Sequence, residues 1–296
     1  MSARSSFMTA VLAAAMASLF ILAPVANAEL TGNYVRFQQC PYKNTEVKKC
    51  VLSVTESGEV VLGSKKVPIV NPVTLQGGAL RAVEEYAQFV GATNGVTLSK
   101  TPQPVPGGLA GLVNCKEIKE PILRLSCELA LENKVTGVNS TLELARPASE
   151  IVLSENRLAE EAGVALKIPV KVHLENPFLG TNCYVGSSSS PIIWELTTGE
   201  TAPPGPNTPI HGRLGFLDFL EEGAIAFGEE ITLVDNAWSA PGTSGCGGPL
   251  VELLLDPVVN TSAGLPAAAG KNTAVLNNTA YFGSAAAVRL NDAENP

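Results

Sequence analysis

Acidic side chains gather in one short segment of the chain. Asp218, Glu221, Glu222, Glu229 and Glu230 fall within thirteen residues. Because Ca²⁺ prefers several oxygen ligands, such a cluster could form a weak cation site. The segment lacks the Asp-x-Asp-x-Asp-Gly spacing of a calcium-binding loop. We therefore interpret it as a solvated acidic face and predict no metal ligands and no cofactor, with a calcium site at 218–230 as the alternative.

A glycine-rich stretch, Gly242–Leu250, reads Gly-Thr-Ser-Gly-Cys-Gly-Gly-Pro-Leu. It resembles the nucleophile loop of chymotrypsin-like serine proteases, whose pattern is Gly-Asp-Ser-Gly-Gly-Pro. The resemblance implies that Ser244 would be a nucleophile and that backbone N–H groups would stabilise an oxyanion. Here Thr243 replaces the acid and Cys246 interrupts the glycines. A turn that lets Cys246 reach its disulfide and precedes a helix at Pro249 explains the same residues, and we favour it.

A serine hydrolase also needs a general base, and the chain has two histidines. His173 lies on an alternating segment among charged residues, which predicts a solvated surface position. His211 follows Thr-Pro-Ile and is predicted in a loop. The chain order His211, then Asp218 or Asp235, then Ser244 is allowed, but the Thr-Ala-Ala-His-Cys setting of the protease family is absent. The sequence therefore predicts no catalytic residues, with a hydrolase using Ser244, His211 and Asp235 as the alternative.

Six cysteines indicate a protein of an oxidising compartment, because disulfides persist there. Six cysteines allow 15 pairings. Local spacing favours the pairs Cys40–Cys50 and Cys115–Cys127, which leaves Cys183–Cys246. A zinc site is the alternative, but the chain has no Cys-x-x-Cys motif to support one.

The second pair carries a geometric condition. Two residues twelve apart in one helix are separated by about 18 Å, which is too far for a disulfide. Cys115 must therefore precede the predicted helix, or this pairing is wrong.

The two tryptophans bear on ligand binding, because sugar-binding surfaces need exposed flat rings. Trp194 lies on an alternating strand and is predicted in the core. Trp238 follows Asp235-Asn236 in a predicted loop, where it is either an exposed anchor for a partner or packed against a disulfide. A sugar-binding surface is therefore not favoured.

The first 28 residues have the pattern of a secretory signal peptide. Arg4 precedes an apolar stretch, and Ala26-Asn27-Ala28 fits the cleavage rule. Removing 28 of the 296 residues leaves 268 and changes the formal charge from -8 to -9, because Arg4 is the only charged residue removed. A net-acidic chain does not suit nucleic acid. No later apolar run is long enough to predict a membrane span after signal cleavage.

The rest of the chain is typical of short strands. One hairpin is predicted over 50–62 with a turn at Glu56-Ser57-Gly58-Glu59, and strands are predicted near 67–70, 73–75, 86–90 and 96–98. Others are expected near 141–145, 192–197, 213–217, 231–234 and 273–276. The clearest strand is 164–175, which alternates without exception, and Pro169 on its polar face predicts an edge strand or a bulge.

Two or three short helices are predicted among these strands. Ile118, Ile122, Leu125 and Leu129 share one helical face, with Pro121 in the first turn. A second helix follows Pro249, and a shorter one at 154–162 would have Ser154 as its N-cap.

We therefore expect a mainly β fold: an antiparallel β-sandwich or barrel with two or three short helices, held by disulfides. Residues 29–296 are predicted to form a single β-rich domain. The segment 101–108, which contains three prolines and two glycines, is where a domain boundary would fall.

Three stretches together resemble a known group of proteins. They are 67–78, then 172–188 with its Cys183, and 234–266 with its Gly-Cys-Gly-Gly motif. The combination is similar to a group of secreted, uncharacterised proteins of high-GC Gram-positive bacteria. The resemblance implies bacterial export and a shared fold, and it supplies no activity, ligand or catalytic residue.

The sequence favours a secreted or cell-surface protein that is non-enzymatic and has a structural or binding role toward an extracellular or cell-envelope partner. The alternative is a secreted serine hydrolase that uses Ser244 in a degenerate protease-like loop.

Overall fold

The structure is a computed structural model that describes residues 29–295. The predicted signal peptide, residues 1–28, lies outside the described residues. Fourteen strands form one hydrogen-bonded sheet, and all strand pairs within it are antiparallel. The expectation of a mainly β, antiparallel fold is confirmed.

The sheet has two parts joined by one short strand. The first part contains β11 (Phe216–Leu220), β12 (Ile225–Asp235), β14 (Thr273–Ser284), β1 (Val47–Leu62), β2 (Lys65–Ile69) and β3 (Val73–Leu80). The second part contains β7 (Val152–Leu153), β8 (Leu166–Glu175), β6 (Asn139–Leu144), β5 (Pro102–Pro104), β9 (Tyr184–Val185), β10 (Ile192–Leu196) and β13 (Thr243–Ser244). Strand β4 (Ala87–Gly91) pairs with β3 on one side and with β7 on the other.

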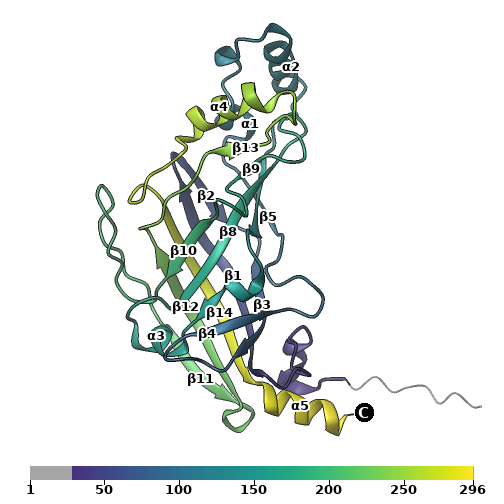
Figure 1. Ribbon diagram of the computed structural model, residues 1–296, viewed down its shortest axis with the longest axis vertical. Coiled ribbons are helices and arrows are strands. Elements are labelled where there is room, and N and C mark those ends of the chain that lie inside the picture. Colours follow the sequence, from purple (N-terminus) through teal and green to yellow (C-terminus); the bar gives the residue numbers. More distant parts are fainter. Residues whose placement is uncertain (1–28, 296) are drawn as a thin grey trace, which may run out of the picture.

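The sheet curls so that its two parts face each other, and β8 overlaps β1 and β14 in the view of Figure 1. The β10 edge of the second part also contacts the first part, at β12. Thr197, directly after β10, exchanges two backbone hydrogen bonds with Val234 of β12, at 3.0 and 2.9 Å. A space enclosed by both parts therefore runs along the inside of the sheet.

The described residues contain five α-helices, more than the sequence predicts. They are α1 (Gly108–Leu112), α2 (Pro121–Glu132), α3 (Glu155–Glu160), α4 (Glu252–Ala263) and α5 (Ala285–Glu294). Short 3₁₀ segments occupy Gly32–Phe37, Cys115–Glu117, Ala148–Glu150 and Glu221–Gly223. Helices α1, α2 and α4 lie together at one end of the long axis, and α5 lies at the other (Figure 1). None of the helices in 29–295 is long and apolar enough to cross a membrane.

The predicted hairpin over 50–62 is wrong, because β1 runs through the predicted turn without reversing. The register of β1 against β14 shifts between Thr55 and Ser57, which is a β-bulge. Gly58 has φ +146°, and a Cβ there would lie 2.1 Å from the carbonyl oxygen of Val275. The residues that resemble a turn therefore let two strands approach closely inside one long strand.

Strand β8 has the predicted alternation, but Pro169 does not mark a sheet edge. β8 pairs with four strands, and Pro169 itself is buried rather than on a wet face. Its carbonyl accepts a hydrogen bond from the N–H of Ala145, just past the end of β6. The missing N–H of Pro169 thus faces the point where β6 stops, which is why an interior strand tolerates proline.

Helix α2 begins at Pro121 as expected, but its predicted apolar face points to solvent. The exposed fractions of Ile122, Leu125 and Leu129 are 76%, 56% and 45%. Ile118, which precedes the helix, is the buried member of the set, at 2%. Periodicity located the helix here but did not identify its packing.

Three disulfides join Cys40–Cys50, Cys115–Cys127 and Cys183–Cys246, the pairs that spacing favours. Cys115 lies in a 3₁₀ segment before α2, so its Cα comes within 5.7 Å of the Cα of Cys127. The geometric condition on this pair is therefore met.

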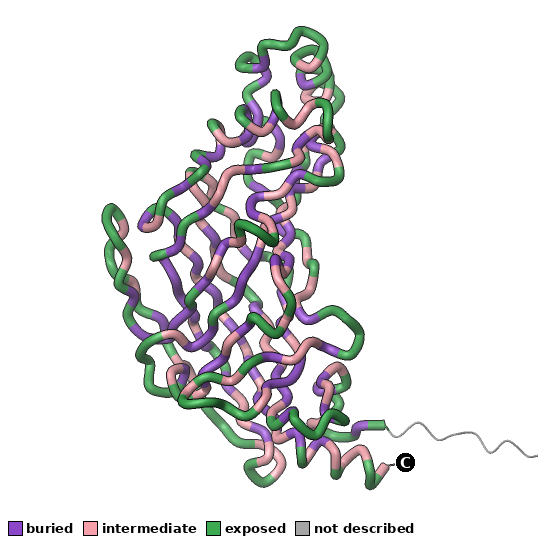
Figure 2. Tube along the Cα trace, viewed as in Figure 1, coloured by how far each residue is buried: buried purple, intermediate pink, exposed green. Residues whose placement is uncertain are grey.

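Most of the buried residues belong to the strands, where the two parts of the sheet face each other (Figure 2). Residues on both sides of 101–108 contribute to this one core, among them Val51 and Trp194. The segment itself contains β5, which pairs with β6. The division into one domain stays a prediction.

Candidate functional site

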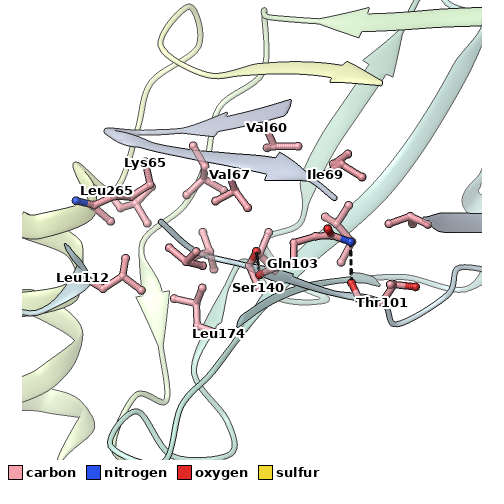
Figure 3. A pocket seen from close by; sticks show the side chains of 17 residues that line it. Val60, Lys65, Val67, Ile69, Thr101, Gln103, Leu112, Ser140, Leu174 and Leu265 are labelled. Carbon is pink, nitrogen blue, oxygen red and sulfur yellow. Dashed lines mark hydrogen bonds between the residues drawn. The ribbon is translucent and has the colours of Figure 1, made fainter. Parts of the chain in front are cut away.

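The described residues contain an apolar cavity of about 60 Å³ at the end of the sheet near α1 and α4. We call it the upper cavity. It is lined by Val60, Leu62, Lys65, Val67, Ile69, Val73, Thr101, Gln103, Val105, Leu112, Ser140, Leu142, Val172, Leu174, Val185, Ala263 and Leu265. Figure 3 shows these side chains converging from several strands and from the ends of two helices.

Strand alternation determines which side chains of β2 line this cavity. Successive side chains of a strand point to opposite faces, so Lys65, Val67 and Ile69 share the inner face. Lys66 lies on the other face, where its ammonium group pairs with Glu59. Because β1 and β2 form a hairpin, Leu62 lies opposite Lys65 in the same wall.

The cavity wall offers few polar groups that lack protein partners. Gln103 is 5% exposed, and its side-chain oxygen accepts hydrogen bonds from the N–H groups of Val70 and Asn71 at 2.9 and 3.0 Å. Its amide nitrogen donates to the carbonyls of Asn71 and Thr101. The Thr101 hydroxyl is bonded to that of Ser99. Since apolar cavities of this kind stay dry, the occupant that fits here is apolar.

Two smaller cavities continue from the upper cavity along the inside of the sheet. The middle cavity, about 40 Å³, shares Ile69, Val73 and Leu142 with the upper one. The lower cavity, about 30 Å³, shares Leu75, Leu166, Leu233, Ser53 and Asn278 with the middle one. The three therefore form a series from the α1 and α4 end toward α3.

Trp194 lines the middle cavity and is 3% exposed, as the sequence predicts for a core residue. Its indole N–H has no hydrogen-bond partner among the described residues. Trp238 is also buried, and its ring lies edge-on to that of Trp194 with the centroids 6.0 Å apart. Of the two alternatives for Trp238, the exposed anchor is thus wrong.

The loop that resembles a protease nucleophile loop is organised around a carboxylate. The N–H groups of Gly245 and Cys246 donate to the two oxygens of Asp256, at 3.1 and 3.0 Å. The N–H of Gly247 donates to the carbonyl of Leu179. Ser244 is exposed on β13, but the donors that would face an oxyanion are already bonded.

The other two members of the hydrolase alternative are engaged elsewhere. The carboxylate of Asp235 is buried and accepts hydrogen bonds from the N–H groups of Glu195 and Ala237, at 2.7 and 2.9 Å. Burial raises the pKa of Asp235, although these two bonds oppose the shift. The Nδ1 atom of His211 contacts the carbonyl of Gly212. Within 29–295 no hydrogen bond joins Ser244 to either residue.

Asp235 also lines an open cleft of about 520 Å³, together with Glu195, Glu200 and Trp238. Both of its carboxylate oxygens hold backbone N–H groups, and the Trp238 indole donates to the Asp235 carbonyl. These contacts give Asp235 a structural role in the turn after β12.

His173 is part of a polar cluster on the outer face of β8, rather than a freely solvated residue. Its side chain is 16% exposed, and its ring stacks on that of Tyr184 at 4.4 Å. Glu143 accepts contacts from Lys100 and Lys171 at 3.1 and 3.3 Å. Burial alone would raise the pKa of Glu143, but the two lysines outweigh it and the pKa is lowered.

The acidic segment does not converge on one point. Glu221 accepts hydrogen bonds from Asn33, and Glu230 pairs with Arg213 at 2.9 Å. Asp218 and Glu229 lie on β11 and β12, each opposite a phenylalanine. Within residues 29–295, no group of three or more acidic, histidine or cysteine side chains is arranged to hold a metal ion.

Sequence reasoning did not find the cavity. Its lining comes from segments as distant as Val60 and Leu265, and a single strand with alternating valines looks the same whether it lines a cavity or a filled core. The only local signal was Lys65, a cation in register with Val67 and Ile69 on an otherwise apolar strand face.

No family model, no curated protein and no solved structure matches this chain.

Proposed function

We propose that this chain is an exported, non-enzymatic binding protein that holds an apolar molecule in the upper cavity. The observation that carries the proposal is the apolar lining of this cavity together with the bonded state of Gln103. Ligand sites are concave and mostly apolar, with few polar groups that fix orientation. The upper cavity has this composition.

Energetics also favour an occupant. An unfilled cavity costs about 24 cal/mol per Å³, so 60 Å³ costs roughly 1.4 kcal/mol. An apolar molecule that enters regains this contact energy and adds its own transfer from water, about 0.8 kcal/mol per CH₂ buried. A ligand larger than the cavity must displace side chains, and the half-buried Leu62, Lys65 and Val67 are best placed to yield.

Three lines support export. Three disulfides are typical of an extracellular protein. The first 28 residues read as a signal peptide, and the resemblance to secreted proteins of high-GC Gram-positive bacteria implies the same route. Secretion or display at the cell surface is therefore the proposed location.

The experiment is a titration of the mature protein with N-phenyl-1-naphthylamine, a neutral dye that fluoresces in apolar surroundings. We expect saturable binding. The variant Val67→Phe places a ring in the cavity wall and should weaken dye binding at least tenfold. Val61→Phe, on the opposite face of the same hairpin, is the matched control and should bind as the unmodified chain does. Equal binding by both variants would refute the upper cavity as the site.

A further inference from the structure

We propose that the ligand is a linear, single-chain amphiphile with an anionic head group, such as a long-chain alkyl carboxylate. Its head would lie at Lys65 and its chain would extend through the upper cavity into the middle cavity, toward Trp194. This inference rests on the proposed function and names the class of molecule that the site takes.

The arrangement of the three cavities specifies a linear shape. Along β1 their lining runs from Leu62 in the upper cavity to Val51 in the lower one. Along β8 and the residue that precedes it, the lining runs from Leu174 to Ala165. At about 3.3 Å per residue the β8 path is about 30 Å long. The hydrocarbon core of a bilayer has about the same thickness and holds two acyl chains end to end, so one long acyl chain extends from the Lys65 end to about the middle cavity.

The width of the path excludes bulky molecules. Neighbouring cavities share lining side chains, including Ile69 and Val73 at the first junction and Leu75 at the second. Rotation of such side chains opens a passage for a chain of methylene groups, the slimmest apolar structure. A fused ring system could occupy no more than the upper cavity, because passing a junction would require the strands themselves to separate.

Lys65 supplies the charge at one end of the path. Its stem lines the upper cavity beside Leu265, and Figure 3 shows its nitrogen at the outer end, away from the apolar side chains. Lysine commonly places its methylene stem on apolar surface and its ammonium group in water. Among residues 29–295, no ion pair or side-chain hydrogen bond involves this ammonium group.

The polar groups deeper in the path do not compete for a head group. The hydroxyl of Thr55 donates to Asn278 at 2.6 Å, and the Asn278 amide donates to the carbonyls of Ile231 and Leu276. These groups satisfy one another, so the inner path offers a carboxylate no cation and no free amide. The indole N–H of Trp194, unpaired within residues 29–295, is a neutral donor, and hydrogen bonds to an ionised partner are about twice as strong as neutral ones. The ammonium group of Lys65 is therefore the better partner, and we place the head group at that end.

The first test uses the fluorescence of the unmodified protein, whose two tryptophans lie 6.0 Å apart at the middle cavity. Saturated fatty acids brominated at carbon 2, at mid-chain or near the methyl end are titrated. Bromine quenches indole fluorescence on close approach. Trp194 pairs with Ile168 of β8, six residues or about 20 Å along the path from Leu174. We therefore expect the strongest quenching by bromine near the methyl end and at most one-third as much by bromine at carbon 2. Equal quenching at all positions would overturn the threading of the chain.

The second test varies length and shape with the carboxylate held constant. Affinity should rise about fourfold per added CH₂ from C8 upward, the factor expected for full burial of each group. Adamantane-1-carboxylate, which is compact, should bind at least 100-fold more weakly than palmitate. If adamantane carboxylate binds as well as palmitate, the linear class is wrong while the apolar cavity stands. If neither these ligands nor the neutral dye binds, the proposed function fails as well.

The third test addresses the head group with two neighbouring lysines. Lys65→Met keeps the apolar stem and removes the charge, and it should weaken palmitate binding roughly two- to fivefold, the range for an exposed ion pair. It should leave methyl palmitate unchanged. Lys66→Met is the matched control, since Lys66 faces outward and pairs with Glu59. An equal loss in both variants, or no loss in either, would overturn the assignment of Lys65.

Discussion

Leu62 and Lys65 lie opposite each other across the β1–β2 hairpin, and both side chains line the upper cavity. The backbone of the turn between them is bonded to the end of α4, because the N–H of Ser64 donates to the carbonyl of Ala263 at 2.8 Å. This arrangement fixes an apolar side chain and a cation at the same end of an apolar cavity. A mouth of this composition suits an amphiphile better than a purely polar or purely apolar molecule.

The disulfide that closes the longest loop is expected to stabilise the fold most. Cys183 and Cys246 are 63 residues apart, whereas Cys115 and Cys127 are 12 apart. In the chain-entropy model these loops correspond to about 4 and about 3 kcal/mol. Replacing both cysteines of a pair by serine should therefore lower the free energy of unfolding more for Cys183–Cys246, as measured by urea denaturation. A larger loss for Cys115–Cys127 would contradict this order.

The exposed face of α2 is expected to contribute little to stability. Ile122→Ser should change the free energy of unfolding by less than about 0.5 kcal/mol, because its side chain is 76% exposed. Ile118→Ala should cost about 2–5 kcal/mol, because Ile118 is 2% exposed in the core. Denaturant titration of both variants measures this difference. A similar cost at the two positions would mean that the face of α2 that contains Ile122 packs against the rest of the protein.

The pKa of Glu143 should rise when a neighbouring lysine is removed. Because folding lowers the pKa of Glu143, its ionised carboxylate stabilises the folded state at every pH above the pKa that it has in the unfolded chain. This stabilisation is lost as the pH falls through the pKa of the folded state. Lys171→Met should raise the pKa of Glu143, as followed by NMR titration of its carboxyl carbon. Lys167→Met is the control on the same strand face, since Lys167 pairs with Glu195 instead. An unchanged pKa in Lys171→Met would refute the pairing.

Ser244 is expected to be unreactive. The N–H groups of its loop are bonded to Asp256, and no base contacts Ser244 within the described part of the chain. A fluorophosphonate probe should therefore fail to label the folded protein, and Ser244→Ala should leave ligand binding unchanged. Labelling of the unmodified chain that disappears in Ser244→Ala would revive the hydrolase alternative.

Local patterns predicted the strands better than they predicted packing. The alternation over 164–175 gave β8, and Ser154 caps α3 by accepting a hydrogen bond from the N–H of Arg157. The bulge between Thr55 and Ser57 was missed because the neighbouring Ser-Gly-Glu residues are equally typical of a turn. The exposed face of α2 was missed because a helical period shows which residues share a face, but not what that face contacts.

The site depended on contacts that a sequence does not display. Leu112, Ser140 and Leu265 reach the cavity only because the sheet curls and α4 meets the β1–β2 turn. The residues whose types suggested chemistry are not assembled into a site. The N–H groups of the Ser244 loop are bonded to Asp256, and the side chains of the acidic segment point to different places. A cavity is defined by volume left between side chains, and no residue type marks such volume in advance.

A crystal structure of the mature protein under xenon pressure would show whether the upper cavity is dry and apolar. Xenon enters dry apolar cavities and is displaced from polar, hydrated ones. We expect xenon within the upper cavity, in contact with Val67, Leu174 and Leu265, and none in the cleft beside Asp235. Ordered water in the upper cavity, with no xenon there, would rule out this cavity as a site for an apolar ligand.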